Sequence, residues 1–412
     1  MPTMSSSVAL QPFNPFDPAT VADPYPWYEA MRDATTAPFL QPFGAHLITR
    51  YEDCRAVLRD PETFSSERMQ PSQRAERAGG PGANILGSDP PTHTRLRRLV
   101  SRDFTPRTIA AMEPRIREIV AKLLDERFRD GTIDIIGDLA GPLPTIVIAE
   151  LLGVPSDDFE QFKVWSDNEI TFVTPATSPA ELARLTESSR QLRAYLEEAI
   201  RQTRAGTAAN REGLIAKLVV AAEDGESLSE EELLSFVVLL LLAGNETTTN
   251  LIGNGALALA RFPQKQAELD RRPELLPAAI EEFLRFDGPV QTTFRRVAKP
   301  TTVHGVDLEP GGSVAVVVAS ANRDPRHFTD PDSLRFDREE NDHLGFGTWL
   351  HMCIGAPLAR LEALAAFEAL LERCPRFGLA APDSALSYST SFALRGLHRL
   401  PIRATPGKGS AG

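Results

Sequence analysis

The sequence predicts a mainly α-helical fold with small β-sheets. Apolar residues recur at helical spacing in many stretches, and one of these stretches is about thirty residues long. Short strand-like runs, separated by Gly- and Pro-containing turns, lie near residues 45–50 and 301–320. A chain of 412 residues can bury a large core, and its 42% hydrophobic and 24% charged residues are typical of a globular protein in water.

The first half of the chain predicts short helices around one strand. Helices are expected over 23–34 and 51–60, with a strand over 45–50 between them. Residues 65–91 are rich in Gly, Pro, Arg and Ser, and a loop of this length is usually functional or disordered. Residues 107–128 place their apolar side chains on one helical face. Further helices are expected over 143–152, 156–166, 179–203 and 211–223.

The clearest helix is expected over 229–261. Ser229 and Glu232 form the S-x-x-E pattern of a capping box before an apolar run, and Pro263 ends the pattern. Roughly thirty residues span about 45 Å at 1.5 Å per residue, so the middle of such a helix must be buried. The remaining elements are helices over 273–285 and 356–373, strands within 301–320, and short strands and turns over 385–404.

The chain shows no repeat and no linker, so we expect one domain over 21–405 with a flexible arm (1–20) and a flexible tail (406–412). The N-terminus lacks a basic segment followed by an apolar one, and the apolar run 233–244 is too short to cross a bilayer. The three cysteines are far apart, which predicts neither a disulfide framework nor a zinc site. The net charge of −12 argues against nucleic acid as a partner. We therefore expect a cytoplasmic monomer that binds neither membrane nor nucleic acid.

Five consecutive polar residues, Asn245 to Thr249, interrupt the long apolar helix near its centre. They could form a solvated stripe, but the surrounding run is too apolar for a superficial helix. Buried polar groups are costly unless they are satisfied, which favours a polar notch that faces a cavity. Gly244 beside them removes a side chain and would let a large group approach. An acid next to a hydroxyl can pass protons into a dry site.

Two charged patterns are weak when taken alone. Glu282 and Arg285 lie three residues apart on a predicted helix, and such pairs are common on surfaces. His93 and Arg97 lie on one side of a helix within an arginine-rich segment that reaches Arg107. That segment could be a solvated helix face, or it could hold carboxylates or dock an acidic partner.

Cys353 lies in a Gly-rich turn, next to His351, just before a helix that Pro357 starts. The most common interpretation of a free cysteine is a buried small apolar residue. The flanking glycines and His351 make this less convincing, because the helix start would favour a thiolate, the form that binds metals. The turn is suited to bringing backbone close to something flat and large.

From Phe346 to Glu362 the sequence follows F-G-x-x-x-H-x-C-x-G-x-P-L-A-R-x-E, which resembles the haem-thiolate loop of bacterial cytochrome P450 enzymes. The other motifs occur in that family's order over nearly the whole chain after about residue 20. The resemblance implies the cytochrome P450 fold, in which a long central helix lies over the haem and the cysteine loop lies beneath it.

The resemblance also assigns the residues that would hold haem b. Cys353 would be the axial thiolate ligand of the iron, and Phe346 would shield the sulfur. Arg296 competes with Arg295 for one position, and Arg295 is preferred because its spacing to Gly305 fits better. The residues that would bind the haem propionates are His93, Arg97, Arg295 and His351.

The family's remaining roles fall on two further groups of residues. Glu246 and Thr247 would guide protons to bound oxygen, while Thr248 and Thr249 would be packing hydroxyls. The structural ion cluster that supports the cysteine loop would consist of Glu282, Arg285 and Arg338, the last from the segment ANRDPRHFTDPDSLRFDRE.

Trp349 departs from the family pattern, which usually has a glycine two residues before the histidine. A side chain in the left-handed region costs about 1–2 kcal/mol. The turn could be rearranged with Trp349 over the haem edge, Trp349 could point outward and shape a partner surface, or the haem could sit differently. We favour the rearranged turn, because the other haem motifs are intact.

The resemblance implies a monooxygenase that uses O2 to hydroxylate or dealkylate a hydrophobic small molecule. Electrons would come from NAD(P)H through a separate ferredoxin- or flavodoxin-type partner with its reductase, because no G-x-G-x-x-G follows a strand. The arginines within 95–107, together with Arg360, would form its docking face. Oxidative coupling or ring closure in a natural-product pathway is an alternative, and haem binding without turnover is a remote one. The expected pocket residues are Ile85, Leu86, Phe172, Val173, Leu239, Val290, Phe294 and Phe392.

Overall fold

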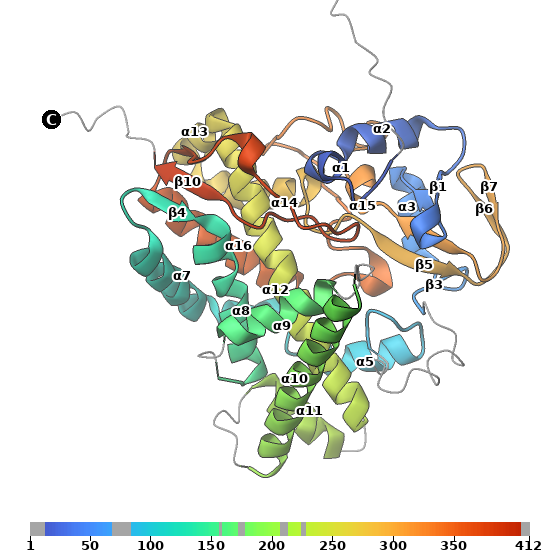
Figure 1. The fold of residues 1–412 in the computed structure, drawn as a ribbon, viewed down its shortest axis with the longest axis horizontal. Helices are drawn as coiled ribbons and strands as arrows, with labels where there is room; N and C mark the ends of the chain where they lie inside the picture. The colour runs from blue at the N-terminus through green and yellow to red at the C-terminus, as the bar shows by residue number, and fades with distance from the viewer. Residues whose placement is uncertain are drawn as a thin grey trace, which may run out of the picture.

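Helices make up most of the molecule, as the sequence predicts, and small sheets lie on two opposite sides of it in the view of Figure 1. The structure is a computed structural model that describes residues 13–67, 84–155, 159–171, 178–206, 213–223 and 228–404. The helices of the first half are α1 (Pro18–Ala22), α2 (Tyr25–Asp33), α3 (Tyr51–Arg59), α5 (Thr92–Ser101), α6 (Pro106–Ala110), α7 (Glu113–Arg127), α8 (Pro142–Leu152), α9 (Phe159–Thr171) and α10 (Pro179–Arg204). Those of the second half are α11 (Leu214–Glu223), α12 (Glu230–Arg261), α13 (Pro263–Arg271), α14 (Leu276–Phe286), α15 (Val318–Ala321) and α16 (Ala356–Arg373).

The described strands form three small sheets. The strands are β1 (Phe39–Leu40), β2 (Ala45–Ile48), β3 (Phe64–Ser65), β4 (Thr132–Asp134), β5 (Thr293–Val297), β6 (Thr301–Val303), β7 (Val306–Leu308), β8 (Ser313–Val316), β9 (Phe377–Leu379) and β10 (Pro401–Ala404). The largest sheet has the order β1-β2-β8-β5-β3, the second has the order β4-β10-β9, and β6 pairs with β7. The strand expected over 45–50 is confirmed as β2, and the run 301–320 contains β6, β7 and β8. In the largest sheet β2 runs parallel to β8, while β5 is antiparallel to β8.

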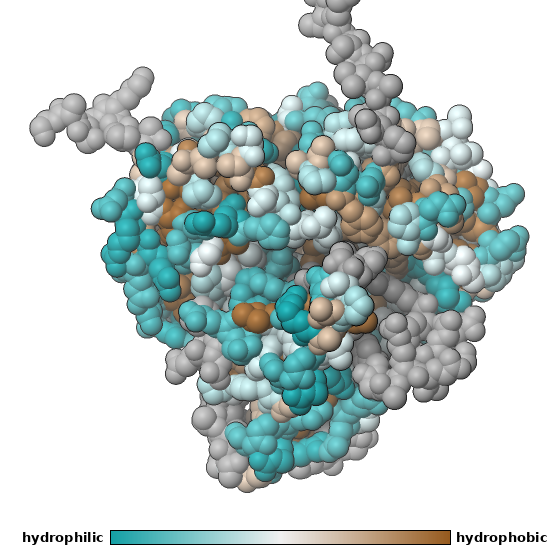
Figure 2. All heavy atoms as spheres, viewed as in Figure 1, coloured by the Kyte–Doolittle hydropathy of each residue, from teal (hydrophilic) through white to brown (hydrophobic). Residues whose placement is uncertain are grey.

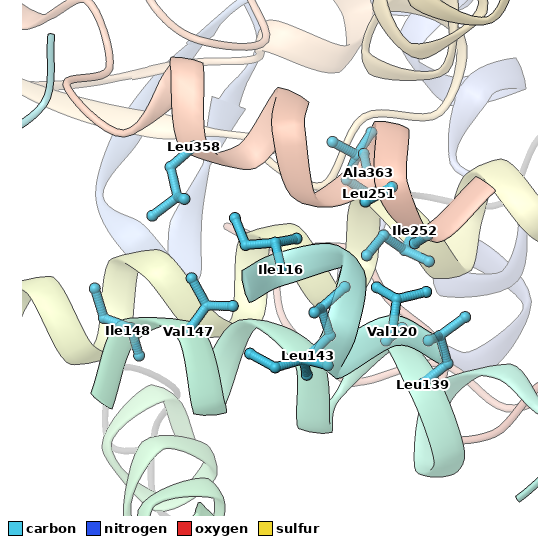
Figure 3. Packing of buried hydrophobic residues seen from close by; sticks show 14 of the residues in the cluster. Ile116, Val120, Leu139, Leu143, Val147, Ile148, Leu251, Ile252, Leu358 and Ala363 are labelled. Carbon is cyan, nitrogen blue, oxygen red and sulfur yellow. The ribbon is translucent and has the colours of Figure 1, made fainter. Parts of the chain in front are cut away.

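The helix α12 runs through the middle of the molecule and packs against α8, α9, α10, α14 and α16 (Figure 1). Its predicted capping box is present, since the Ser229 hydroxyl accepts the Glu232 N–H at 3.1 Å and the Glu232 carboxylate accepts the Ser229 N–H at 2.9 Å. Figure 3 shows the core that surrounds it, where Leu251 and Ile252 of α12 meet side chains of α7, α8 and α16. Burial of this apolar surface fixes the helices on which the polar residues of the site lie.

Two helical boundaries differ from the expectation. The helix expected over 107–128 is divided into α6 and α7, because Pro114 has no N–H to continue a helix and takes a position in the first turn of α7 instead. In the same way Pro263 ends α12 and begins a further helix, α13. Proline therefore marks a helix start at both places as much as a helix stop.

The segment that precedes α2 packs against the rest of the protein from Phe13 onward, although a flexible arm was expected up to residue 20. The ring of Phe13 lies 6.1 Å from that of Tyr28 and 5.9 Å from that of Phe392, and the Asp17 carboxylate caps α1. Residues 13–20, which were expected to belong to the flexible arm, therefore pack against the body of the protein.

Two helical segments, Ile135–Leu152 and Glu230–Arg261, are long and apolar enough to span a membrane. Most of each segment is buried inside the protein, so the core accounts for its apolar composition. Figure 2 shows that hydrophilic side chains cover much of the outer helical surface on the face in view.

Candidate active site

Cys353 lies between a short 3₁₀ helix, Trp349–His351, and the first residue of α16. Its N–H donates to the Phe346 carbonyl at 2.8 Å, which closes the loop, and Pro357 lies in the first turn of α16 as predicted. Desolvation raises the pKa of the thiol, while backbone N–H groups of Gly355 and Ala356 act to lower it. The residue as a whole is nevertheless exposed, so the loop that carries the desolvated thiol lies beside open space.

The helix α12 has an open face at its centre, although the residues on either side are buried. Leu239, Ala243 and Thr247 follow one another at four-residue spacing, and all three have accessible surface. Glu246 shares this open stretch, whereas Asn245 and Thr249 are buried. Of the polar notch predicted over Asn245 to Thr249, only Glu246 and Thr247 therefore lie on the open face.

A cluster of basic side chains lies beside the Cys353 loop. The rings of His93 and His351 are 4.4 Å apart, and Arg97 donates to the Leu350 carbonyl at 2.9 Å. Desolvation, followed by the charges of Arg295 and His93, lowers the pKa of His351 to about 4. Desolvation and then Arg97 lower the pKa of His93. Both imidazoles are therefore largely uncharged near neutral pH, and Arg97 and Arg295 supply the positive charge that favours an anion here.

His93 is 1% exposed, and neither of its ring nitrogens has a hydrogen-bond partner. The Leu350 carbonyl is near enough to favour the charged ring but does not meet hydrogen-bond geometry. A buried polar group without a partner costs free energy, so its presence indicates a group that completes the site. Within the part of the chain that the structure describes, no carboxylate forms an ion pair with His93, Arg97 or His351. A carboxylate of a bound molecule would give the His93 ring a partner, whereas His351 Nε2 already bonds to the Ser66 hydroxyl at 2.9 Å.

Arg295 and Arg296 of β5 point to different neighbours. Arg295 is buried and its charge acts on His351, whereas Arg296 donates to the Glu67 carbonyl at 3.0 Å. The strand alternates its side chains between the two faces of the sheet, so only one of two neighbours can join the cluster. The structure therefore places Arg295, the preferred residue, beside the loop histidine.

Glu282, Arg285 and Arg338 come together in the interior, as the sequence predicted. Arg285 donates to both carboxylate oxygens of Glu282 at 2.8 Å, and Nε of Arg338 lies 3.0 Å from each of them. Both partners of the first pair are fully buried. A charge this deep is tolerated only with complete pairing and hydrogen bonding. Arg285 meets this requirement through the carbonyls of Asn322, Pro331 and Ser333.

Asn322 connects this ion cluster to the cysteine loop, a role that sequence reasoning missed. Its carbonyl accepts from Arg285 at 2.9 Å, and its side-chain oxygen accepts the Leu344 N–H at 2.8 Å. The Leu344 carbonyl in turn accepts the Gly347 N–H at 2.8 Å. The buried cluster thus fixes the start of the loop that carries Cys353.

A family model described as Cytochrome P450 matches residues 161–377. The chain is also 41% identical over 389 residues to the cytochrome P450 monooxygenase PikC of Streptomyces venezuelae, covering 93% of this chain and 91% of that protein. The chain belongs to the cytochrome P450 family. It is an oxidoreductase, a monooxygenase that uses haem iron and O2.

Two further comparisons agree with this membership. The polyketide biosynthesis cytochrome P450 PksS of Bacillus subtilis is 38% identical over 368 residues, which cover 87% of this chain and 89% of that protein. The crystal structure of CYP109E1 from Bacillus megaterium in complex with testosterone superposes with a TM-score of 0.87 at 35% identity, covering 95% of this P450 and all of that chain. Cytochrome P450 enzymes generally take hydrophobic substrates and need redox partners. Membership among the monooxygenases removes the alternative of haem binding without turnover.

The observed site fits a haem. Cys353, an exposed residue, can supply a thiolate ligand, and the basic cluster with its unpartnered His93 suits the propionates. The open face of α12 leaves space for a flat group.

Glu246 and Thr247 lie side by side on the open stretch of α12. The Thr247 hydroxyl donates to the Ala243 carbonyl at 2.7 Å, one turn back. The Glu246 carboxylate lies 3.5 Å from Nζ of Lys163 on α9 and accepts from Asn250 at 3.3 Å. Sequence reasoning missed Lys163 and Asn250, because neither follows a pattern of spacing with a recognisable chemistry.

The neighbouring polar residues of α12 serve packing instead. Thr249 is buried and donates to the Ala140 carbonyl at 2.9 Å, and Asn245 accepts from Thr145 of α8 at 2.9 Å. Gly244 was expected to let a large group approach, but a Cβ there would lie 3.3 Å from Cδ1 of Ile148. The missing side chain at Gly244 therefore lets helix α8 pack closely against α12.

Trp349 keeps the backbone conformation that a glycine would adopt. Its φ is 56°, in the left-handed region, and its side chain is 50% exposed. The turn therefore keeps the backbone shape of the family pattern, in contrast to the favoured expectation of a rearranged turn. Half of the indole surface is accessible, and the left-handed backbone carries this side chain at a cost in strain.

The expected pocket residues divide into several groups. Leu239 lies on the open face of α12, but Leu86 is 55% exposed on the surface. Phe392 is buried, with its ring 5.3 Å from that of Phe43 and 6.3 Å from that of Phe294. Ile85 packs against the main core, and Val290 bridges to Leu394. Phe172 and Val173 lie outside the described residues.

Proposed function

We propose that this cytochrome P450 binds haem b through Cys353 and hydroxylates or dealkylates a hydrophobic small molecule. The observation that supports this most is the exposed residue Cys353 next to a cluster of basic side chains whose buried His93 has no partner. When bound, the haem supplies the iron at which O2 is reduced and cleaved. The propionates would be held by His93, Arg97, Arg295 and His351.

Phe346 would cover one side of the sulfur in this assignment, because its carbonyl holds the Cys353 N–H and its ring packs against the core. An apolar ring at this place excludes water from the ligand and influences the reduction potential of a metal. Glu282, Arg285 and Arg338 would act through Asn322 to keep the loop in position.

Glu246 and Thr247 would deliver protons to the oxygen-binding side. The path from solvent would begin at Asp167, whose carboxylate contacts Lys163, and would pass through Lys163 to Glu246. Side-chain exposure falls along this series, from 50% to 28% to 15%. The Thr247 hydroxyl donates to the Ala243 carbonyl in this structure, so to relay a proton it would turn its own proton from Ala243 toward the oxygen-binding side while its oxygen accepts another from the Glu246 side.

Electrons would come from NAD(P)H through a separate ferredoxin- or flavodoxin-type partner and its reductase. The arginines Arg98, Arg102 and Arg107 are exposed on and next to α5, the helix that also contributes Arg97. An acidic partner would be attracted to such a face. We further propose that the enzyme is a cytoplasmic monomer with one domain.

The substrate class is suggested by the relatives, which include a polyketide-pathway P450 and a P450 crystallised with testosterone. We propose a polyketide- or steroid-sized molecule with a large apolar surface. Oxidative coupling or ring closure would use the same residues, and hydroxylation remains the main proposal.

The test is a screen of macrolides and steroids against the purified ferric enzyme, with the change of iron spin state as the signal. Ligands that shift the spectrum are then turned over with a surrogate ferredoxin, its reductase and isotopically labelled O2. The proposal predicts a product that contains one labelled oxygen atom, or the dealkylated product. Spectral shifts without oxidised product, under conditions in which PikC turns over its own substrate, would contradict it.

A further inference from the structure

The side chains of Glu281, His343 and Arg360 form a hydrogen-bonded network next to the Cys353 loop. Arg360 of α16 donates from Nε and Nη2 to the two carboxylate oxygens of Glu281, at 2.7 and 2.8 Å. His343 lies 3.2 Å from the same carboxylate through Nε2. Desolvation acts against the charge of Glu281, but Arg360 and then His343 outweigh it and lower the pKa of the carboxylate to about 2. The carboxylate is therefore ionised throughout the physiological range.

The hydrogen bonds fix the protonation of His343. The Gly345 N–H donates to Nδ1 at 3.1 Å, so Nδ1 carries no proton. The proton of the neutral ring must then lie on Nε2, from which it is donated to Glu281. The side chain of His343 is 3% exposed, which keeps water from competing for this bond. Both ends of the imidazole are thus committed to holding Glu281 and the loop together.

Arg360, the second partner of the Glu281 carboxylate, also contacts the Cys353 loop. Its guanidinium carbon lies 4.6 Å from the centre of the Phe346 ring. The Phe346 carbonyl accepts the Cys353 N–H at 2.8 Å, and Arg360 lies within electrostatic range of the Cys353 sulfur. One cation therefore contacts the ring of the residue whose carbonyl holds Cys353, and its charge acts on the Cys353 sulfur.

We propose that Glu281 and His343 are positioning residues that lock Arg360 against the Cys353 loop, so that its charge and the Phe346 ring stay fixed beside the haem ligand. The inference rests on the proposed role of Cys353. The sequence predicted that Arg360 docks a redox partner. In this inference Arg360 supports the Cys353 loop instead, because its Nε and Nη2 donate to Glu281. Glu281 directly precedes Glu282 in α14. One glutamate therefore supports the loop through Arg360, and the other supports it through the buried cluster with Arg285.

The two charges have opposite effects on the reduction potential of the iron, because reduction adds a negative charge near the sulfur. Glu281→Gln leaves the Arg360 charge uncompensated and is expected to raise the potential. Arg360→Gln leaves the carboxylate and is expected to lower it. Arg360→Lys keeps the charge and is expected to return the potential most of the way to wild type. A matched control is Glu368→Gln, since Glu368 also lies on α16 but pairs with Arg117 at the surface.

The experiment is a spectroscopic reductive titration of the haem-loaded full chain and these variants, after each has been checked for the thiolate band of its reduced carbon monoxide complex. Shifts of opposite sign for Glu281→Gln and Arg360→Gln, with Glu368→Gln unchanged, would support the inference. Shifts of one sign, or none beyond the control, would overturn it. If Glu281→Gln does not fold, a failure of Arg360→Lys to restore the potential lost in Arg360→Gln would overturn it as well. A wild-type enzyme without the thiolate band would refute the role of Cys353 itself.

Discussion

A single substitution at Thr247 tests its proposed role in proton transfer separately from the packing of α12. Thr247→Ala removes the hydroxyl that accepts and passes a proton, but leaves the Ala243 carbonyl free on the open face of α12. We expect product formation to fall about tenfold or more while oxygen consumption continues, because a lost proton relay uncouples the two. The measurement is the ratio of product to consumed oxygen. Thr249→Val is the control, since Thr249 bonds to Ala140 and should change stability without changing that ratio.

Trp349 has a stability cost that can be measured. Its φ of 56° is in the left-handed region, so Trp349→Gly should relieve strain and raise the free energy of unfolding by about 1 kcal/mol. The converse change at Gly347, whose φ is 70°, should lower it by about the same amount when alanine is introduced. Denaturant unfolding of the two variants against wild type tests this. Destabilisation by Trp349→Gly would show that the indole contributes more through packing than the backbone loses.

At the level of elements, the close contacts of α12 set the positions of its neighbours. A Cβ at Gly255 would lie 2.7 Å from both Phe283 of α14 and Phe367 of α16. Gly255→Ala must move one of these rings in a tightly packed core, so we expect a loss of about 1–3 kcal/mol. Gly378 serves as the control, because a Cβ there meets nothing within 4 Å. Equal thermal stability of Gly255→Ala and Gly378→Ala would contradict this account of the packing.

Patterns among neighbouring residues predicted most helices and strands. They could not predict the roles of residues whose partners lie on other elements. The start of α12 follows from Ser229 and Glu232, because a capping box depends only on neighbouring residues. The break before α7 was missed because a proline in a helical pattern can mark a start or a stop. The motif residues of the cysteine loop and ion cluster were found by their spacing. Lys163, Glu281 and Asn322 were not, because their roles come from partners on other elements.

For the whole molecule, Glu362 links stability to pH. It is buried in α16, one carboxylate oxygen has no partner, and burial raises its pKa well above the usual range. The unfolded chain loses this proton near pH 4, whereas the folded protein retains it. The group therefore lowers stability progressively as pH rises through the interval between the unfolded and the folded pKa, and has no such effect below it.

Glu362→Gln removes this titration. The variant should gain stability relative to wild type as the pH is raised from 4 to 8, with little gain at the acid end. Thermal unfolding of both proteins across this range is the measurement. Parallel curves for the two proteins would show that Glu362 is ionised in the fold and has a partner there.

The whole account depends on Cys353 as the thiolate ligand of haem in a site that the helices assemble around it. The most direct test is the absorption spectrum of the reduced, haem-loaded protein under carbon monoxide. We predict the red-shifted Soret band of a thiolate-ligated haem in the wild type and its loss in Cys353→Ser at equal haem content. A wild-type protein that binds haem but lacks this band, or a Cys353→Ser protein that retains it, would contradict the central claim.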